Sequence, residues 1–168
     1  MLEIFYPDEM AENTYAIDFE ALYQKGYRGI IFDIDNTLVP HGAPADARAE
    51  KLFENLKRIG FKCCLLSNND KERVDMFNER IGVETLEDAR KPSQKGYNKA
   101  MKLMGTTSRD TLSVGDQIFT DVWGSRRAGL HTVLVGQLDK KEEIQIILKR
   151  YLEKIVLFFY KRSKRKGK

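Results

Sequence analysis

Residues 29–38 read Gly-Ile-Ile-Phe-Asp-Ile-Asp-Asn-Thr-Leu, and this stretch decides the class of fold. The run from Gly29 to Phe32 has no polar side chain, which is typical of a short strand buried on both faces of a parallel sheet. Two carboxylates, Asp33 and Asp35, follow immediately. The stretch therefore predicts a central strand whose carboxyl end opens directly onto a polar site.

The rest of the chain alternates between apolar runs and stretches with helical periodicity. Strands are expected at 61–66, 83–86, 111–114 and 131–135, and helices at 44–58, 69–80, 92–104 and 121–128. Asn69 or Asp70 can cap the second of these helices, and Pro92 suits the first turn of the third. Regular alternation of this kind predicts a layered α/β fold with a mostly parallel sheet.

Polar residues follow the predicted strands at the same edge of that sheet. They are Asp33, Asp35, Ser67, Asn68, Lys91, Asp116 and Asp121. In parallel sheets ligands bind at the carboxyl ends of the strands. The sequence therefore predicts that these side chains share one site.

The residue types at this edge fit phosphate-ester hydrolysis. Asp33 and Asp116 would hold Mg²⁺, which prefers oxygen ligands and neutralises an anionic ester. Asp33 can attack phosphorus and form an aspartyl-phosphate. Asp35 is placed to protonate the leaving oxygen and then to activate water. Ser67 and Lys91 can bind the phosphate oxygens as charge builds on them.

Four of these segments, in this order, resemble the motifs of the haloacid dehalogenase (HAD) superfamily of phosphatases. They are the Asp-Ile-Asp-Asn-Thr-Leu run 33–38, Ser67 after an apolar strand, Lys91 before Pro92, and the Gly-Asp-Gln-Ile-Phe-Thr-Asp run 115–121. The resemblance implies a three-layer, Rossmann-like fold. It also implies that Asp33, Asp116 and the backbone carbonyl of Asp35 hold Mg²⁺, with Asp121 supporting either the metal ligands or Lys91.

A narrower resemblance covers most of the chain. Residues 5–8 (Phe-Tyr-Pro-Asp), 29–39 and 67–69 (Ser-Asn-Asn) resemble the bacterial YqeG family, in HAD subfamily IIIA. That family is similar to the phosphatidylglycerophosphate phosphatases of yeast mitochondria and plant plastids. The resemblance implies that the substrate is phosphatidylglycerophosphate and the product phosphatidylglycerol.

Several nearby residues allow more than one interpretation. Thr37 either contacts a phosphate oxygen or shapes the turn, whereas Asn36 is expected to support the turn. Asn68 either contacts substrate or positions its loop. His41 is expected in a surface loop, with substrate contact as the alternative, and His131 is expected to be structural.

The spacing of the motifs leaves no room for a cap domain. Residues 36–66 and 68–90 can hold little more than a helix and a strand each, far less than a folded domain. A site without a cap suits a large or surface-presented substrate better than a small metabolite, which an enzyme would enclose. We also expect no signal peptide and no transmembrane helix, because the start lacks a basic segment and the apolar runs are short. The adjacent cysteines at 63 and 64 fit a reduced, cytosolic core strand.

The C-terminal segment differs in charge from the rest. Residues 140–168 contain 11 Lys or Arg against 3 Glu, whereas residues 1–139 are mildly acidic. We therefore expect a phosphatase domain at 1–139 and a basic amphipathic helix and tail at 140–168, appended to the same domain. The apolar residues with helical spacing are Ile144, Ile147, Leu148, Tyr151, Leu152, Ile155 and Phe159. This stripe packs on the domain's own sheet, or it binds an anionic membrane surface.

The tail also bears on location and partners. A basic amphipathic helix on a membrane would make the protein cytoplasmic but peripheral at the inner face. Nucleic acid is not expected as a partner, because no nucleic-acid-binding module accompanies the tail. The sequence predicts no oligomeric state.

Two enzymatic functions therefore remain open. One is hydrolysis of a phospholipid headgroup. The other is hydrolysis of a soluble or macromolecule-bound phosphate, such as a nucleotide, a sugar phosphate or an RNA end. A phosphate-binding scaffold without activity is disfavoured, because every catalytic position is filled.

Overall fold

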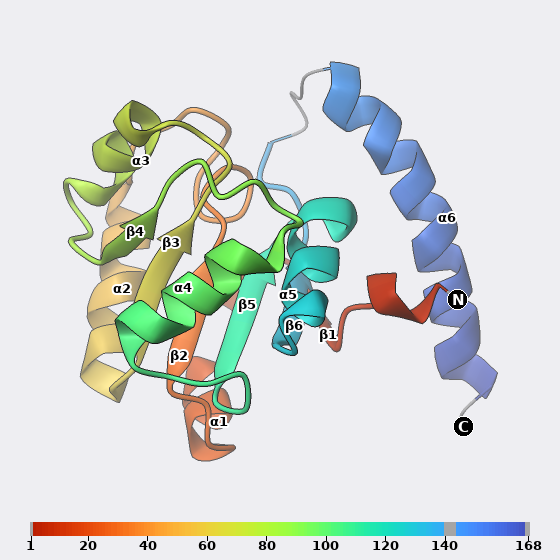
Figure 1. Cartoon of the computed structure of the whole chain (residues 1–168), viewed down its shortest axis with the longest axis horizontal. Coiled ribbons are helices and arrows are strands. Elements are labelled where there is room, and N and C mark those ends of the chain that lie inside the picture. Colours follow the sequence, from red (N-terminus) through yellow and green to blue (C-terminus); the bar gives the residue numbers. More distant parts are fainter. Residues whose placement is uncertain (1, 140–143, 167–168) are drawn as a thin grey trace.

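The computed structural model describes residues 2–139 and 144–166, with side chains described for 2–139 and 149–164. Six parallel strands form one sheet in the order β1-β6-β5-β2-β3-β4. The strands are β1 (Glu9–Ala11), β2 (Gly29–Phe32), β3 (Lys62–Leu66), β4 (Glu84–Leu86), β5 (Thr111–Gly115) and β6 (His131–Val135). Helices cover both faces of the sheet, so the fold is a three-layer α/β sandwich, as the sequence predicts (Figure 1).

The helices are α1 (Phe19–Gln24), α2 (Ala47–Ile59), α3 (Lys71–Asn78), α4 (Gln94–Met104), α5 (Trp123–Arg127) and α6 (Ile144–Lys166). Three short helical turns complete the fold: η1 (Glu3–Phe5), η2 (Thr14–Ala16) and the π-helical turn η3 (Ile118–Val122).

Strand β2 lies inside the sheet and contributes to the core on both faces. Ile30 and Phe32 point into the core formed with α1, α2 and α3, whereas Ile31 points into the core formed with α4. The alternation follows from the two-residue period of a strand. The apolar run therefore places the end of β2, and Asp33 after it, in the middle of the carboxyl edge.

Asp70, one of the two predicted caps, caps α3 by accepting the Arg73 N–H. The start of α4 differs from the prediction. Pro92 lies before α4 rather than in its first turn, because Ser93 caps the helix and Gln94 is its first residue. The helix expected at 121–128 is split into η3 and α5. The N-terminal elements β1 and α1 were not predicted. Both are short, at three and six residues, and short elements show little periodicity.

No cap domain stands over the sheet in the described part of the chain. Residues between β2 and β3 form a loop and α2, and those between β3 and α4 form α3, β4 and loops. The gap-length prediction is confirmed. In addition, none of the helices described is long and apolar enough to cross a membrane.

Helix α6 lies beside the β1 edge of the sheet, next to the N-terminus (Figure 1). It packs on the domain through Glu153, Val156 and Tyr160, which are 5–8% exposed. Val156 joins the cluster of Ile118 and Val122 from η3. The predicted apolar stripe faces the other way: Tyr151, Leu152, Ile155 and Phe159 are 44–62% exposed, as is Phe158. The side chains of Ile144, Ile147 and Leu148 lie outside the described residues.

Candidate active site

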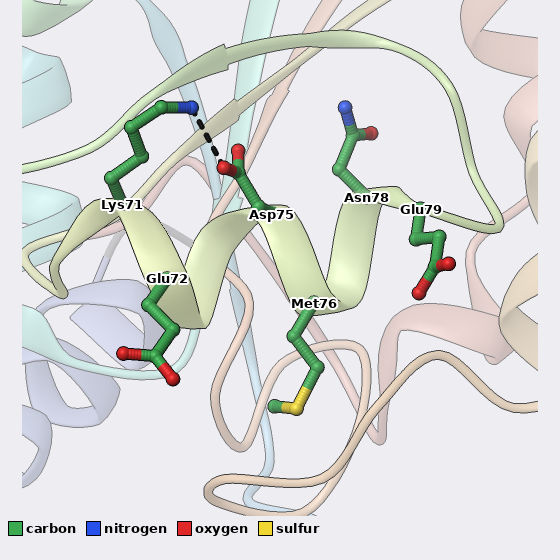
Figure 2. Close-up of a pocket in the computed structure, with 6 residues that line it drawn as sticks. All are labelled: Lys71, Glu72, Asp75, Met76, Asn78 and Glu79. Carbon is green, nitrogen blue, oxygen red and sulfur yellow. Dashed lines mark hydrogen bonds and ion pairs between the residues drawn. The ribbon is translucent and has the colours of Figure 1, made fainter.

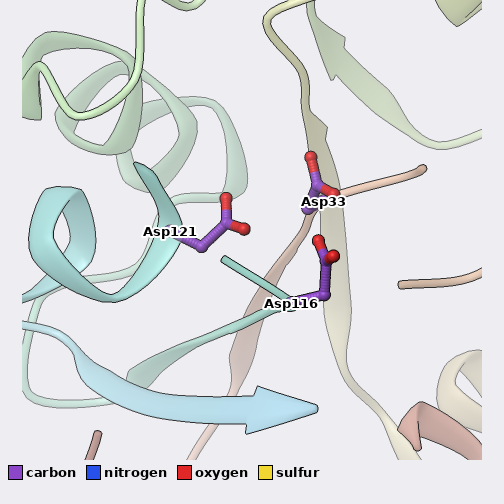
Figure 3. A group of neighbouring side chains, drawn as sticks. All are labelled: Asp33, Asp116 and Asp121. Carbon is purple, nitrogen blue, oxygen red and sulfur yellow. The ribbon is translucent and has the colours of Figure 1, made fainter. Parts of the chain in front are cut away.

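Three carboxylates meet at the carboxyl edge of the sheet. Asp33 follows β2, Asp116 follows β5, and Asp121 lies in η3. One carboxylate oxygen from each lies within 4.8 Å of the others (Figure 3). The strand order brings them together, because β2 and β5 are hydrogen-bonded neighbours although far apart in sequence. Their adjacency is what the sequence predicts for a common edge.

Lys91 is the cation that pairs with two of these carboxylates. Its Nζ donates to Asp33 Oδ1 at 2.6 Å and to Asp121 Oδ1 at 2.7 Å, and its side chain is 4% exposed. Burial alone would lower the pKa of Lys91, but the charges of Asp121 and Asp33 hold that pKa well above its ordinary value. The ammonium is therefore permanently charged, and Asp121 supports Lys91, which is one of the two roles expected for it.

The charged forms of Asp33 and Asp116 are disfavoured at this site. Burial raises the pKa of Asp33 to about 6, opposed by Lys91 and reinforced by the charge of Asp121. Burial, with the charges of Asp33 and Asp121, raises the pKa of Asp116 well above its usual range. Two buried acids whose charged forms are disfavoured fit a site that binds a positive charge. A hard divalent cation held by these oxygens would supply it, since carboxylate oxygens are the ligands such cations prefer.

Thr37 and Arg150 hold the two oxygens of Asp116. The Thr37 hydroxyl lies 3.4 Å from Asp116 Oδ1 and 3.2 Å from Asp33 Oδ2. Arg150 of α6 donates to Asp116 Oδ2 at 2.5 Å and to the Asp116 carbonyl at 2.6 Å. Outer contacts of this kind orient a metal-binding carboxylate. Arg150 binds Oδ2, and Oδ1 lies beside the Thr37 hydroxyl, which also contacts Asp33.

Three hydrogen-bond donors surround the Asp35 carboxylate. Its carboxylate accepts from the Gly42 N–H at 2.7 Å, from Asn69 Nδ2 at 2.5 Å and from Arg73 at 2.8 Å. These donors suit a carboxylate that accepts, so Asp35 must release one contact to deliver a proton. Arg73, in the first turn of α3, was not singled out in the sequence, because only the fold brings it to Asp35.

Ser67 and Asn68 occupy the end of β3 as expected. The Ser67 oxygen accepts from the backbone N–H and the side-chain amide of Asn69, which leaves its own proton free to donate. The Asn68 side chain bonds the Lys91 backbone on both sides, accepting from its N–H at 2.6 Å and donating to its carbonyl at 3.3 Å. Of the two roles considered for Asn68, positioning a loop is the one these contacts support.

Gly115, the last residue of β5, occupies a position that requires glycine. A Cβ at Gly115 would lie 2.4 Å from the Cβ of Asp121. The π-helical turn brings Asp121 back over the end of β5, where its Oδ2 accepts the Gln117 N–H at 3.0 Å. Close approach of this kind is available only to glycine.

A pocket of about 220 Å³ lies at the carboxyl edge of the sheet, beside Asp33 and Lys91. It is lined by Asp33, Asp35, His41, Ser67, Asn68, Asn69, Lys91, Gln117, Thr120 and Lys149. A larger depression of about 800 Å³ lies on α3 (Figure 2). Its lining carries no group from the carboxyl edge, and Lys71 there is paired with Asp75 at 2.7 Å. The small pocket is therefore the candidate site.

The remaining predicted positions fall as follows. Asn36 has a positive φ of 60° and accepts the Asp139 N–H, which fits support of the turn. His41 lines the pocket, with Nδ1 3.9 Å from Asp35. His131 lies at the opposite end of the sheet, at the start of β6, and pairs with Glu9 at 3.1 Å.

Comparison with known proteins identifies the family. Residues 88–147 match the HAD-hydrolase-like family model. Over 162 residues the chain is 37% identical to the probable phosphatase YqeG of Bacillus subtilis, covering 96% of this chain and 94% of that protein. The chain belongs to the YqeG family of HAD phosphatases. It is thus a phosphatase, as the four motifs predict.

The chain is also similar to a second named phosphatase in sequence and to a solved phosphatase in fold. The chain is 31% identical over 161 residues to phosphatidylglycerophosphate phosphatase 1 of Arabidopsis thaliana, covering 90% of this chain but 46% of that protein. In fold it resembles 3-deoxy-D-manno-octulosonate 8-phosphate phosphatase from Moraxella catarrhalis, solved with magnesium and phosphate ions. The TM-score is 0.52 at 16% identity, over 68% of this chain and 72% of that one.

Proposed function

We propose that this phosphatase removes the terminal phosphate of phosphatidylglycerophosphate, using Mg²⁺ and an aspartyl-phosphate on Asp33. The observation that carries the chemistry is the cluster of Asp33, Asp116 and Asp121, two of which, Asp33 and Asp121, bind the Lys91 ammonium. Asp33 and Asp116, with the carbonyl of Asp35, would hold the ion. Bound there, Mg²⁺ would offset the negative charge that raises the carboxylate pKa values and would orient the phosphate.

The residues of the chain divide the reaction between them. A carboxylate oxygen of Asp33 attacks phosphorus, and the bond from phosphorus to the ester oxygen breaks. Asp35 gives its proton to the departing oxygen, then takes one from the water that hydrolyses the aspartyl-phosphate. Lys91 and the Ser67 hydroxyl bind the phosphate oxygens throughout. Free phosphate leaves, and Asp33 is regenerated.

The lipid substrate is supported by the relatives and by the open site. One relative carries the name phosphatidylglycerophosphate phosphatase and matches 90% of this chain. No cap covers the site in the described part of the chain, so a headgroup projecting from a lipid surface can reach Asp33. An enzyme acting on a small soluble ester would usually enclose it to exclude water.

Helix α6 supports docking on an anionic membrane. Its outer face exposes Tyr151, Leu152, Ile155, Phe158 and Phe159 by 44–62%. Exposed basic residues continue the same helix at Lys161, Arg162 and Lys164. An apolar face beside basic residues is typical of a helix lying in the interface of an anionic bilayer. In this proposal residues 140–168 are a membrane-binding appendage of the domain at 1–139, and the protein is cytoplasmic and peripheral at the inner face.

The test compares two substrates in the full chain and in a chain ending at residue 160. The truncation removes the basic end but keeps Tyr160, whose ring packs on Tyr6 at 5.3 Å. We expect unchanged hydrolysis of p-nitrophenyl phosphate. The rate on phosphatidylglycerophosphate in vesicles containing anionic lipid should fall, because each basic residue near the surface contributes about 1 kcal/mol.

A point variant separates apolar from ionic binding. Phe158→Glu should weaken vesicle binding severalfold, since the side chain is 61% exposed and its ring packs on Phe159 of the same helix. Leu103→Glu is the matched control, because Leu103 is 45% exposed but lies on α4. Equal losses from both variants would contradict membrane docking by α6. Vesicle hydrolysis far below that of nucleotides or sugar phosphates would favour a soluble substrate instead.

A further inference from the structure

Helix α6 contributes to the catalytic pocket as well as to the outer surface. Lys149 lines the pocket that has Asp33 and Lys91 among its walls, although Lys149 comes 58 positions after Lys91 in the sequence. The adjacent Arg150 binds Asp116. The C-terminal helix therefore reaches the site at two consecutive residues with different contacts.

The position of Lys149 is fixed by buried charges. Glu153 is 5% exposed and accepts the Ile118 N–H at 2.8 Å, while Arg150 bonds both Glu153 and the carbonyl of Asp116. These contacts connect one turn of α6 to the loop after β5. Because Arg150 and Glu153 both bind the segment that follows β5, the adjacent Lys149 is held at the mouth of the pocket.

Within the described residues, the other cations that contact the site are paired with acids. Lys91 bridges Asp33 and Asp121, Arg73 pairs with Asp35, and Arg150 pairs with Asp116. His41 lies 3.9 Å from Asp35.

Lys149 differs from these cations. It is exposed, and its ammonium makes no hydrogen bond or ion pair with the described residues. Gln117 and Thr120 line the same pocket, and their side-chain polar atoms likewise have no partner in the described part of the chain. The pocket thus presents the side chains of Gln117 and Thr120, which can donate hydrogen bonds, beside Lys149, whose charge no described acid pairs with.

We propose that Lys149, with Gln117 and Thr120, forms a second anion subsite that binds a phosphodiester in the substrate. The inference rests on the proposed function, because phosphatidylglycerophosphate carries two phosphates joined by one glycerol. The terminal phosphate lies at Asp33 and Lys91, and the retained diester lies at the mouth beside Lys149. The subsite gives the enzyme selectivity for a phosphomonoester that carries a second anionic group, and α6 supplies it in place of a cap.

Two water-soluble esters test the subsite without a membrane. One is the deacylated headgroup, glycerophosphoglycerol phosphate, which carries both phosphates. The other is glycerol 3-phosphate, which carries only the monoester. In the full chain with Mg²⁺, the ratio of kcat/KM for the two esters measures the contribution of the second phosphate.

Substitution of Lys149 should change that ratio. Lys149→Gln should lower it about tenfold, mainly through KM for the headgroup, because a charge-assisted contact is lost. Lys149→Arg keeps the charge and should restore most of the ratio. Lys102→Gln, an exposed lysine on α4 outside the pocket, is the matched control and should leave it unchanged.

The outcomes separate this inference from the proposed function. Equal losses on both esters with Lys149→Gln, or a ratio that does not move, would overturn the subsite. Hydrolysis of phosphatidylglycerophosphate vesicles by the wild type tests the lipid function independently. Vesicle hydrolysis with an unmoved ratio leaves the lipid function standing and removes the subsite. A ratio that depends on Lys149 without vesicle hydrolysis supports the subsite for a soluble substrate with two phosphates.

Discussion

Replacement of Asp33 by asparagine should abolish turnover and yet stabilise the metal-free protein. The amide cannot attack phosphorus to form an acyl-phosphate. It can still accept the Lys91 hydrogen bond through its oxygen and can donate to the Thr37 hydroxyl through its nitrogen. The contacts of Asp33 at 2.6 Å and 3.2 Å therefore survive, and the main change is the loss of one buried negative charge.

The size of the effect follows from the pKa of Asp33. Burial raises that pKa from 3.8 to about 6, so the folded state binds the proton more tightly than the unfolded chain. This contribution to stability is fully present below pH 3.8 and is lost as pH rises through about 6. Above pH 7 the ionised carboxylate costs up to about 3 kcal/mol, at about 1.4 kcal/mol per pKa unit. Asparagine removes this cost, which already includes the attraction of Asp33 to Lys91.

Thermal unfolding in chelator measures the prediction. At pH 7.5 Asp33→Asn should melt up to about 6–12 °C above the wild type, since a change of about 3 kcal/mol shifts the melting temperature by about 2–4 °C per kcal/mol in a domain of this size. At pH 4.5 the difference should shrink, because Asp33 is then protonated. Mg²⁺ should raise the melting temperature of the wild type more than that of the variant. A variant that melts at or below the wild type at pH 7.5 would refute the electrostatic reasoning.

Three further predictions concern the metal, the loop after β5 and the anchor of α6. Chelation should abolish hydrolysis, and Ca²⁺ should inhibit in competition with Mg²⁺, because its looser coordination disturbs in-line attack; assays across metal concentrations check this. Gly115→Ala should cut kcat at least tenfold and lower stability, since the new Cβ would lie 2.4 Å from the Cβ of Asp121. Glu153→Ala should cost about 2–3 kcal/mol by leaving the buried Ile118 N–H without an acceptor, measured by denaturant unfolding.

Much of the fold and site follows from local sequence. The strand at 29–32 and the apolar runs near 61–66, 111–114 and 131–135 are strands in the structure, because continuous apolar runs bounded by polar turns leave few alternatives. Strand ends in a parallel sheet share one edge, so residues as distant as Asp33 and Asp116 could be assigned to a common site before any contact was known.

The arginines that bind the site carboxylates could not be predicted in this way. Arg73 reaches Asp35 across 38 positions, and Arg150 reaches Asp116 across 34. No local pattern distinguishes either arginine from a solvated surface residue. Their roles depend on how α3 and α6 are placed against the loops, which is a property of tertiary packing.

Helix α6 shows why periodicity identifies a face but not its partner. The spacing of Tyr151, Ile155 and Phe159 gives an apolar stripe, and for an ordinary surface helix that stripe would face the core. Here the core side instead includes Glu153, a residue that composition alone would assign to solvent. Glu153 can be buried because it bonds the Ile118 N–H and Arg150, so its charge is compensated where it lies. A helix fixed to its domain by polar contacts is free to present its apolar stripe outward.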